Sequence, residues 1–437
     1  MAAFRCAVSE EVTGYTLDNW QVLKVNAERL AADFDALSRI GATPDGGVHR
    51  PALSPAHLEA RVWLRERVQT AGLQFRMDGA GNHSALLECG LENAPTLLLG
   101  SHLDSVPNGG RFDGALGVLA ALESLRVVKE SGLSLPVHLE AIDFTDEEGT
   151  LVGLLGSAAL AGKLTAQDLL TPRGGREALL AGLKRAGLEE AGLLAARRDP
   201  GCLAGYLELH IEQGPRLQNA GAEIGMVSAI VGICSYRLDF VGRADHAGTT
   251  PMQERRDAGL GASEFILAAH DLVLESYSDC VINVGELRYA PGAFNIVPER
   301  ASLALELRAP QVGLFTRLEV DLLDLAQATA GRHRLELETR FLGRHQPSPM
   351  SLSAQQAINE AAGDLGLHVM PLVSGAGHDA QSLAGLCPTG MLFIPSQGGA
   401  SHSAREFSQW QDCLNGADVL LQAALRLAFQ ERPADLP

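Results

Sequence analysis

The sequence predicts an α/β protein in which a doubly wound, mostly parallel sheet is interrupted by a smaller inserted α+β domain. Two observations predict this fold. Apolar runs with the length of buried strands alternate with helical segments in residues 1–225 and again in residues 345–437. Between them, residues 226–344 follow the order strand–helix–strand–strand–helix–strand, which is that of a ferredoxin-like unit. We therefore expect a larger domain in two sequence segments, with the α+β domain inserted.

The strands of the larger domain are predicted by apolar runs that end in polar residues. Thr96–His102 (TLLLGSH), Val137–Thr145 and Leu203–His210 have the length and composition of buried strands. Gly114–Lys129, between the first two, has helical periodicity. This alternation favours a parallel sheet with helices on both faces. After the insert, the pattern resumes with a helix, two strands and a helix: Ala354–Leu365, His368–Val373, Met391–Ile394 and Asp412–Gln430.

The inserted domain is predicted from a change of pattern near residue 226. Its last segment, RHRLELETRFL, alternates apolar and polar residues, as expected of a strand with one exposed face. The earlier segments are a long strand, a helix, two strands and a second helix. In chain order, the six expected elements are Met226–Val241, Arg255–Glu275, Asp279–Arg288, Glu299–Arg308, Val312–Thr329 and Arg332–Leu342.

Composition argues against several classes of protein. The 437 residues carry a formal net charge of −18, so a nucleic-acid partner is not expected. No apolar run reaches the ~18 residues of a membrane span. The first residues, MAAFRCAVSEEV, lack the apolar core of a secretion signal. The seven cysteines are scattered without a CxxC pair, which is typical of reduced thiols. We expect a cytoplasmic protein that does not bind a membrane.

Polar clusters follow three of the predicted strands directly. The cluster HLD begins at His102, TDEEG begins at Thr145 and HIEQG begins at His210. In open α/β sheets, ligands bind beyond the carboxyl ends of the strands. The three clusters therefore bring imidazoles and carboxylates to one edge of the sheet.

The donor groups in these glycine-rich segments indicate a metal centre. They are His102, Asp104, Asp113, Glu147, Glu148, His210 and His402. Imidazole and carboxylate together suit a borderline divalent metal such as zinc, manganese, cobalt or nickel. Even five of these seven donors would be too many for one tetrahedral site. They suit two ions about 3.5–4 Å apart that share one carboxylate.

Local chemistry suggests a role for some of these donors. Asp113, in FDGALG, is the candidate for the shared carboxylate, because its small neighbours allow close approach. Of the adjacent acids Glu147 and Glu148, one would bind a metal while the other takes a proton from the bridging water. Asp104, two residues beyond His102, is placed to accept a hydrogen bond from that imidazole.

These motifs resemble those of the di-metal peptidase-fold amidohydrolases. The chain is most similar to the branch of N-carbamoyl-L-amino-acid hydrolases, allantoate amidohydrolases and β-ureidopropionases. The matching motifs span nearly the whole chain in the same order: GSHLDSVPNGGRFDGALGVLAALE, DFTDEEG, ELHIEQGP, GRADHAGTTPM, AFNIVPE, SGAGHDA and GGASHSAREF. The resemblance implies a di-zinc peptidase-like catalytic domain in residues 1–225 and 345–437. It implies a lid and dimerisation domain in residues 226–344.

The resemblance also assigns the metal ligands by position. His102, Asp113 and His210 would hold one ion. Asp113, Glu148 and His402 would hold the other. Each subunit would then carry two divalent ions, of zinc, manganese, cobalt or nickel, because the same ligands accept all four metals.

Further residues are assigned to catalysis and substrate binding by the resemblance. Glu147 would be the general base that relays a proton from water to the leaving nitrogen. His246 would come from a partner subunit and stabilise the tetrahedral oxyanion. Gln213, Asn295 and Arg308 would orient the substrate, with the Arg308 guanidinium clamping its carboxylate.

The implied function is hydrolysis of the linear-amide (ureido) C–N bond of an N-carbamoyl-L-amino acid or related ureide. The nucleophile would be a water that bridges the two metals. The implied partners are a small substrate that bears a carboxylate and a second copy of the chain in a homodimer. Alternatives on the same scaffold are an allantoate amidohydrolase and an aminoacylase or dipeptidase. A rival of another class is a metal-free binding protein, which the full ligand set argues against.

Three positions depart from the pattern of the resemblance. Cys234 stands where many members carry Arg, and Gln397 and Ser403 stand where Arg and Asn are frequent. None of the three is an expected metal ligand, so these differences bear on substrate identity and on lid contacts. His378 and Asp379, in GAGHDA, are left open as residues that border the pocket.

Overall fold

The computed structural model describes residues 23–430, which form two compact units. The first unit contains the chain up to residue 227, residues 350–372 and the chain from residue 378. The second unit contains residues 228–349 and the short return segment 373–377. It therefore extends a few residues beyond the end of the predicted insert. The N-terminal sequence MAAFRCAVSEEV, on which the expectation about secretion rests, lies outside the described residues.

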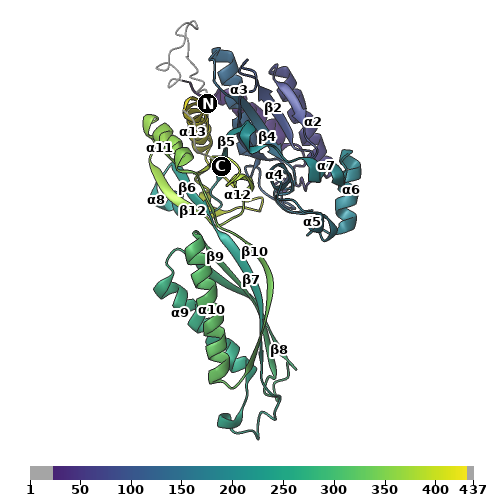
Figure 1. Ribbon diagram of the computed structural model, residues 1–437, viewed down its shortest axis with the longest axis vertical. Coiled ribbons are helices and arrows are strands. Elements are labelled where there is room, and N and C mark those ends of the chain that lie inside the picture. Colours follow the sequence, from purple (N-terminus) through teal and green to yellow (C-terminus); the bar gives the residue numbers. More distant parts are fainter. Residues whose placement is uncertain (1–22, 431–437) are drawn as a thin grey trace, which may run out of the picture. The chain divides into compact units, whose positions relative to one another are not determined.

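A mixed sheet of nine strands is the main sheet of the chain (Figure 1). Its order is β1-β2-β4-β3-β5-β13-β6-β11, with β12 also paired to β6. The four central strands β4, β3, β5 and β13 pair in parallel, as expected, whereas β1, β2, β6 and β11 pair antiparallel. The strands are β1 (Gln74–Met77), β2 (His83–Leu87), β3 (Thr96–His102), β4 (His138–Phe144), β5 (Leu203–Ile211), β6 (Ile224–Ile230), β11 (Ser348–Pro349), β12 (Val369–Ser374) and β13 (Thr389–Ile394).

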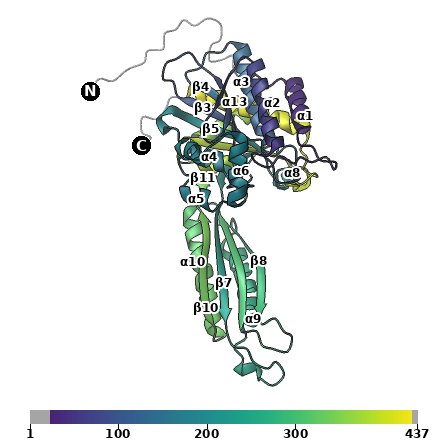
Figure 2. The same ribbon diagram turned by 90° about the vertical axis from the view of Figure 1, so that its right-hand side faces the viewer.

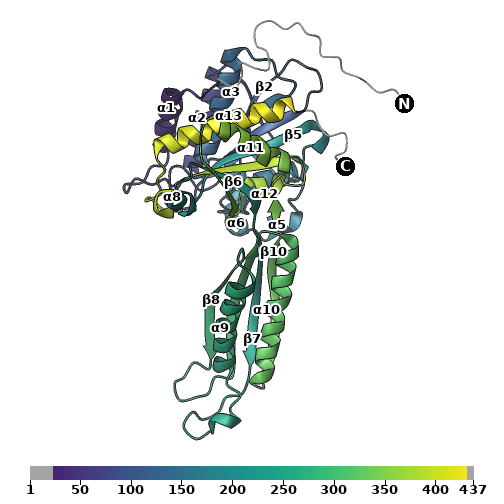
Figure 3. The same cartoon turned by 90° about the vertical axis from the view of Figure 1, so that its left-hand side faces the viewer.

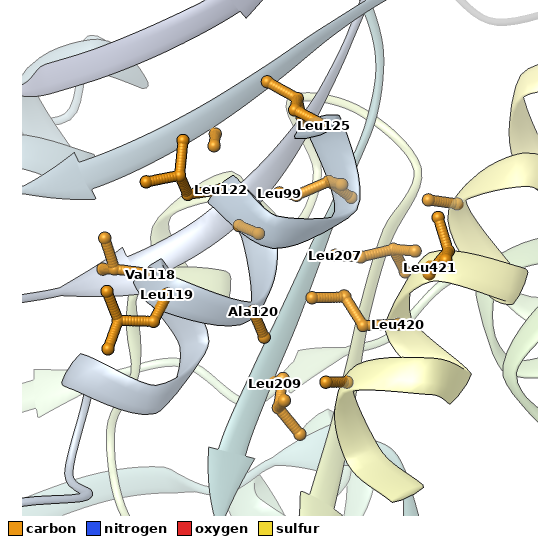
Figure 4. Close-up of a cluster of buried hydrophobic side chains, with 14 of the residues drawn as sticks. Leu99, Val118, Leu119, Ala120, Leu122, Leu125, Leu207, Leu209, Leu420 and Leu421 are labelled. Atoms are coloured by element: carbon orange, nitrogen blue, oxygen red, sulfur yellow. The ribbon is translucent and has the colours of Figure 1, made fainter. Parts of the chain in front are cut away.

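Long helices pack on one face of this sheet. Side chains alternate along a strand, so Leu99 of β3 shares a face with Leu207 and Leu209 of β5. These leucines pack against α3 (Ala115–Ser131) and α13 (Trp410–Phe429), as Figure 4 shows. The same core includes α1 (Ala27–Ser38), α2 (Pro55–Thr70) and α11 (Leu352–Asp364). No helix within residues 23–430 has the length and apolar character needed to cross a membrane.

The short helix α12 (Asp379–Leu383) lies toward the opposite face. Glu208 alternates with Leu207 and Leu209, and its carboxylate accepts a hydrogen bond from the N–H of Ala380, in the first turn of α12 (2.9 Å). The segment between β4 and β5, which sequence analysis left unassigned, forms several short helices with a small leucine core of their own. The short helices are α4 (Leu155–Leu160), α5 (Ala166–Leu170), α6 (Arg176–Ala186), α7 (Glu190–Ala195), η2 (Pro200–Cys202), α8 (Arg216–Ala220), α12 (Asp379–Leu383) and η4 (Gln397–Gly399).

The direction of winding changes at β3. From β3 the chain passes through α3 to β4 on one side, while β5 lies on the other side of β3. Ligands bind at such a switch point, beyond the carboxyl ends of the strands. His102 is the last residue of β3, Glu147 follows the end of β4, and His210 is the last but one residue of β5. The fold therefore brings these side chains to one edge of the sheet.

The second unit is a four-stranded antiparallel sheet with two helices. The strand order is β10-β7-β9-β8, and the elements follow the predicted strand–helix–strand–strand–helix–strand order. Figure 2 shows the strands running alongside one another, and Figure 3 shows both helices together on one face. Phe240, Leu303 and Phe315 are buried between the sheet and the helices. The elements are β7 (Gly232–Val241), η3 (Met252–Glu254), α9 (Ala258–Ser276), β8 (Val281–Ala290), β9 (Arg300–Ala309), α10 (Val312–Arg332) and β10 (Glu336–His345).

The long strand predicted over Met226–Val241 is wrong. The segment forms two strands, β6 and β7, which belong to different sheets. Val231 interrupts them, and its N–H donates to the carbonyl of Ser374 (3.0 Å). Gly232 begins β7 so close to Pro347 that a Cβ there would lie 2.5 Å from its ring. The apolar pattern of the segment does not reveal the break, because both strands continue it.

Candidate active site

His102 ends β3 with its imidazole buried. Its Nδ1 lies 3.0 Å from the main-chain oxygen of Asp104. Because a carbonyl oxygen only accepts, Nδ1 carries a proton, and the neutral imidazole has its lone pair on Nε2. This Nε2 is buried without a hydrogen-bond partner, and it lies 3.5 Å from both Asp113 Oδ1 and Glu147 Oε2.

His210 of β5 repeats this arrangement. Its Nδ1 lies 2.9 Å from the main-chain oxygen of Ile211, so its lone pair is also on Nε2. That Nε2 lies 3.0 Å from Asp113 Oδ1. The His378 ring packs edge-on against the His210 ring, with 4.5 Å between the centroids, and both rings are buried. Two imidazoles from different strands thus point at one carboxylate oxygen.

Asp113 lies on the loop that opens α3, and its two oxygens face different imidazoles. Oδ1 faces His102 and His210. Oδ2 lies 3.5 Å from Nε2 of His402. The next residue, Gly114, has a φ of 64°, and a Cβ there would lie 2.4 Å from the His102 ring. The loop therefore needs glycine at this position to approach the imidazole.

The carboxylate of Asp104 holds the acidic pair that follows β4. It accepts hydrogen bonds from the N–H groups of Glu147 and Glu148, both at 3.3 Å. The carboxylate itself stays 3.8 Å from Nδ1 of His102, so Asp104 accepts from that imidazole through its main chain. Asp104 therefore connects the end of β3 to the loop after β4.

In the described part of the chain, two groups of residues could each hold a metal ion, and Asp113 belongs to both. Within each group, the donor atoms lie within 4.8 Å of one another. The first ligand group is His102, Asp113 and His210, and all three residues are buried. The second ligand group is Asp113, Glu148 and His402. His402 lies on a loop with 52% of its side chain exposed, and its Nε2 is 3.4 Å from Glu148 Oε2. These are the two groups that the resemblance assigns to metal ions.

The donors in both groups fit divalent cations. Lone pairs of nitrogen and carboxylate oxygen repel at 3.0–3.5 Å unless a proton or a cation lies between them. In a metal-bound histidine, the other ring N–H is usually donated to a carbonyl or a carboxylate. His102 and His210 both donate Nδ1–H to the main chain. A divalent cation, which these donors suit, would therefore give the buried Nε2 of His102 the partner that it lacks.

The pKa shifts of these groups in the metal-free chain also favour a bound cation. Burial raises the pKa of Glu147 and of Glu148 well above its usual value. Burial alone would raise the pKa of Asp113 too, but His210 and His102 outweigh it and hold that pKa well below its usual range. Burial opposes charge on His102, yet the carboxylates around it, Glu147 first, raise its pKa. A cation would release protons from these groups and take their place.

Gln213, expected to bind substrate, contacts the second ligand group. Its Nε2 donates to Asp113 Oδ2 at 2.8 Å, and its main-chain N–H donates to the hydroxyl of Ser396 (3.0 Å). Its backbone has a φ of 58°, which is uncommon for a residue other than glycine. The structure therefore ties Gln213 to the shared carboxylate, and its role toward substrate stays a prediction.

Glu406 is a site residue that sequence reasoning missed. Its buried carboxylate accepts hydrogen bonds from the N–H groups of Phe112 (2.9 Å) and Asp113 (3.1 Å). Its other oxygen accepts from the hydroxyl of Ser401 at 2.9 Å, next to His402. Burial raises the pKa of Glu406 to about 7. Glu406 thus links the loop of Asp113 to the loop of His402, and its only signal in the sequence was its place in the motif GGASHSAREF.

His246 and Asn295, expected at the substrate, lie together in the second unit. The N–H of Ala247 donates to the main-chain oxygen of Asn295 (3.1 Å), and His246 forms an isolated bridge with Ile296. Nδ1 of His246 accepts a hydrogen bond from the N–H of Gly248 at 3.0 Å, so the neutral ring carries its proton on Nε2. His246 and Asn295 are both exposed.

Arg308, the expected carboxylate clamp, lies near the end of β9 in the same unit. Its Nε donates to Glu306 Oε1 at 2.9 Å, and its Nη2 lies 2.7 Å from the same oxygen. Its Nη1 donates to the carbonyl of Gly375 (2.5 Å). Because a guanidinium has five N–H groups, both terminal nitrogens keep one for another partner. The side chain is about one-third exposed (33%).

The departures and the open positions have distinct surroundings. Cys234 is buried in β7, with its Sγ 3.5 Å from Glu319 Oε1, so this difference alters the core of the second unit. Gln397 is exposed in η4, whereas the hydroxyl of Ser403, beside His402, is buried without a hydrogen-bond partner. His378 is buried against the first ligand group, and Asp379 begins α12.

The sequence matches the model of one protein family, described as peptidase family M20/M25/M40, over residues 98–426. An N-carbamoyl-L-amino acid amidohydrolase of Geobacillus stearothermophilus is 37% identical over 409 residues, which cover 93% of this chain and 100% of the relative. A ureidoglycolate hydrolase of Arabidopsis thaliana is 35% identical over 418 residues, covering 93% of this chain and 88% of the relative.

The fold also matches a solved structure of the same kind. A hydantoinase/carbamoylase-family amidase from Burkholderia multivorans is similar with a TM-score of 0.84 and 33% identity, covering 93% of this chain and 99% of the other. Enzymes of the family bind divalent metals, and the two ligand groups are the candidate sites. The chain therefore belongs to peptidase family M20/M25/M40 and, like these relatives, is an amidohydrolase.

Proposed function

We propose that the chain hydrolyses the ureido C–N bond of an N-carbamoyl-L-amino acid, with two divalent ions held per subunit. The observation that carries the proposal is the convergence of His102 and His210 on one oxygen of Asp113, with His402 and Glu148 at its other oxygen. The relatives named for this activity support the choice of substrate. Allantoate, named in a relative from Bacillus subtilis, is the alternative ureide.

The two ligand groups would each hold one ion, with Asp113 shared between them. Nitrogen and oxygen donors without thiolate suit zinc, manganese, cobalt or nickel. Such cations supply Lewis acidity, which polarises a carbonyl and makes water a stronger nucleophile. This help is needed because nitrogen donation makes a ureido carbonyl a poor electrophile. The orphaned Nε2 of His102 supports the assignment.

Glu147 would act as the general base. Its Oε2 lies 3.5 Å from Nε2 of His102, and its main-chain N–H is held by the Asp104 carboxylate. Burial raises the pKa of Glu147 in the metal-free chain. Release of that proton on metal binding would leave a carboxylate able to accept a proton from water. It would take a proton from the attacking water and pass it to the leaving nitrogen. An N-carbamoyl amino acid and one water would then yield ammonia, carbon dioxide and the free amino acid.

The second unit would supply the groups that bind substrate. Nε2–H of His246 is available as a donor to the developing oxyanion, because Nδ1 already accepts from Gly248. Asn295 lies beside it, and Arg308 keeps an N–H on each terminal nitrogen for a carboxylate. Gln213, tied to Asp113, would orient the substrate at the metals.

We also propose that the second unit is a ferredoxin-like lid that joins two subunits in a homodimer. Three leucines of α9, Leu260, Leu267 and Leu274, are 51%, 68% and 69% exposed and recur every seven residues, so they form one apolar stripe. The edge strand β8 exposes Val281 and Tyr289 as well. Exposed apolar stripes and free sheet edges are typical of interfaces. In the dimer, His246 would act on the substrate of the partner subunit.

A cytoplasmic location is part of the proposal. Six cysteines of the described residues are free: Cys89, Cys202, Cys234, Cys280, Cys387 and Cys413. Free thiols are typical of proteins in a reducing compartment. The expected partners are thus a small carboxylate-bearing substrate and a second copy of the chain.

The catalytic proposal is tested by a substrate panel with metal analysis. The chain is stripped of metal, reloaded with zinc, manganese, cobalt or nickel in turn, and assayed on N-carbamoyl-L-amino acids, allantoate, N-acetyl amino acids and dipeptides. Ammonia release from the carbamoyl compounds is the expected result. Free amine without ammonia, from the N-acyl substrates alone, would instead identify an aminoacylase or dipeptidase. Protein that binds no metal after careful reloading would contradict the enzyme and favour a binding protein.

The homodimer has a separate test. Leu267→Glu places a charge in the middle of the α9 stripe, and we expect a monomer by sedimentation equilibrium. Leu352→Glu is the matched control, since Leu352 is 82% exposed in the first unit and lies outside the stripe. A wild-type monomer, or a Leu267→Glu variant that remains a dimer, would contradict the proposed interface.

A further inference from the structure

Leu103, between His102 and Asp104, is held at both of its main-chain polar groups. Its N–H donates to Asp143 Oδ1 at 2.9 Å, and its carbonyl accepts from Nε of Arg50 at 3.1 Å. The Leu103 side chain is buried as well. The peptide groups next to a proposed metal ligand are therefore fixed by charged side chains that do not belong to either ligand group.

Asp143, in β4, forms a buried ion pair with Arg61 of α2. Its Oδ2 accepts from Nε of Arg61 at 2.8 Å, and the two side chains are 0% and 2% exposed. Nη2 of Arg61 donates to the hydroxyl of Thr145 (2.9 Å) and to the carbonyl of Phe144 (3.2 Å). Thr145 lies two residues before Glu147. Arg61, from α2, thus holds the end of β4 while Asp143 holds the residue after β3.

Arg50 provides a second anchor on the same loop. It is 1% exposed, and its Nη1 donates to the carbonyls of Leu37 (2.8 Å) and Ile40 (3.2 Å) at the end of α1. Its own N–H donates to the hydroxyl of Ser105 (2.9 Å), and Ser105 returns a main-chain hydrogen bond of 3.0 Å. The residues that follow His102 are therefore tied to α1 and to β4 at the same time.

These contacts lie at the ends of β3 and β4, where the distance between His102 and the Glu147–Glu148 pair is set. Strands β3 and β4 pair in parallel, with His102 opposite Phe144. One strand ends in a proposed metal ligand and the other leads to Glu147 and Glu148. Replacement of a buried ion pair by apolar residues of similar volume is often neutral for stability. An apolar pair in place of Arg61 and Asp143 would, however, offer no donor to Thr145 and no acceptor to Leu103. The buried charges therefore provide orientation.

We propose that Arg50, Arg61 and Asp143 form a brace of positioning residues that sets the distance between His102 and the Glu147–Glu148 pair. The inference rests on the proposed function, since it concerns the affinity of that site for its metals. The brace touches neither substrate nor metal. It acts by holding main-chain groups on two adjacent strands, so its loss is expected to weaken metal binding and to slow turnover with little effect on the Michaelis constant.

The first unit contains a matched control for a buried arginine. Nη1 of Arg126, in α3, donates to Asp33 Oδ2 at 2.6 Å, and the two side chains are 8% and 9% exposed. Arg126 lies eleven residues into α3, which places it roughly 17 Å along the helix from the site. Lysine in place of either arginine keeps the charge and loses the forked donor geometry. Both substitutions therefore keep a buried charge and remove a guanidinium, at different distances from the ligands.

The experiment compares Arg61→Lys and Arg126→Lys with the wild type. Each metal-free protein is titrated with Mn²⁺ by calorimetry, its thermal unfolding is recorded, and kcat and KM are measured after saturation with metal. We expect both variants to unfold at a lower temperature. Only Arg61→Lys should lose affinity for Mn²⁺, by about 10–100-fold, and lose kcat, with KM changed less than about 2-fold.

The outcomes separate the brace from the proposed function. Metal affinity and kcat of Arg61→Lys that match those of Arg126→Lys would overturn the brace alone. A wild-type chain that binds none of Mn²⁺, Zn²⁺, Co²⁺ and Ni²⁺ would overturn the proposed function and the brace with it. If Arg61→Lys does not fold, Thr145→Val carries the same test, because it removes one acceptor of Arg61 and keeps the shape. About a 3-fold loss of Mn²⁺ affinity in Thr145→Val supports the brace, and unchanged affinity overturns it.

Discussion

The two ligand groups share Asp113 but differ in how firmly their other members are held. In the first group, His102 and His210 are buried, and each donates Nδ1–H to a main-chain oxygen. In the second, His402 stands half exposed on a loop with a φ of 52°. One group is thus built into the ends of two strands, while the other is completed by a loop residue.

This difference teaches that the two proposed metal positions are not equivalent. Ligands that are already oriented lose little freedom when a cation binds, whereas an exposed side chain on a loop must be ordered at that moment. A buried position is also shielded from competing water. We therefore expect the first group to bind its ion more tightly and the second group to gain and lose its ion more readily.

The largest effect is expected where the two groups meet. Asp113→Ala removes the shared carboxylate, so both ions should be lost after dialysis, with activity lowered by at least about 10⁴-fold, or about 5.4 kcal/mol. Metal content by elemental analysis and turnover of the preferred substrate check this. Retention of one full equivalent would show that one group binds without the shared acid, and would break the comparison.

A different kind of loss is expected at the base. Glu147→Gln keeps the shape of the side chain and leaves both ligand groups complete, so metal content should stay at the wild-type level. Turnover should fall by about 10³-fold, because proton transfer to and from water is lost. If the variant loses metal as well, Glu147 belongs to the ligands, and the role of base must be assigned elsewhere.

The asymmetry itself is tested by His402→Ala against His210→Ala. We expect His402→Ala to keep about one equivalent of metal after dialysis. The ion held by His102, Asp113 and His210 does not depend on that loop. His210→Ala should lose the tightly bound equivalent instead. Calorimetric titration of the two metal-free variants measures the affinities that remain. Equal losses in the two variants would mean that the groups are equally organised.

The smallest effect is expected from pH. In the metal-free chain the pKa of Glu147 and of His102 is raised, so the folded state binds more protons than the unfolded state. Stability from these groups is present at low pH and falls as pH rises above the unfolded values of about 4.3 and 6.5. The lowered pKa of Asp113 acts the other way, but only at acid pH.

The stability that bound metal adds has the opposite pH dependence. It increases with pH, because the ligands must release their protons to bind metal. The unfolding temperatures of metal-loaded and chelated protein should therefore differ by a few degrees more at about pH 8 than at about pH 6. Differential scanning fluorimetry in matched buffers measures this difference. The same gap at both pH values would mean that the ligands do not titrate on metal release.

Much of the fold could be predicted because its central strands are short apolar runs that end directly before polar clusters. Thr96–His102 was predicted with the bounds that β3 has, since the run ends where its polar cluster begins. The same logic predicted that His102 and His210 would lie at one edge of the sheet, and the resemblance added Asp113 to them. The break between β6 and β7 could not be predicted, because period-two alternation does not say which sheet a strand joins.

The hydrogen bonds that support the site could not be predicted from the sequence, for a different reason. Arg50 and Arg61 are single charged residues outside any motif, and Glu406 lies in a motif that does not reveal its partners. All three bind residues that lie far away along the chain. Asp104 was expected to accept from His102, but its carboxylate instead holds Glu147 and Glu148, which depends on how two strand ends meet. Motifs indicate the reacting groups, whereas the contacts that hold them depend on the three-dimensional fold.

The absence of a side chain at Gly114 has a consequence for anyone who wishes to redesign this enzyme. Even alanine there would push on the His102 ring, so random libraries that include this position will mostly yield inactive clones. Diversity is better placed around Gln397 and Ser403, which are no part of either ligand group and differ from the family pattern. A designer can thus keep the close approach at His102 intact and vary nearby positions that supply no ligand.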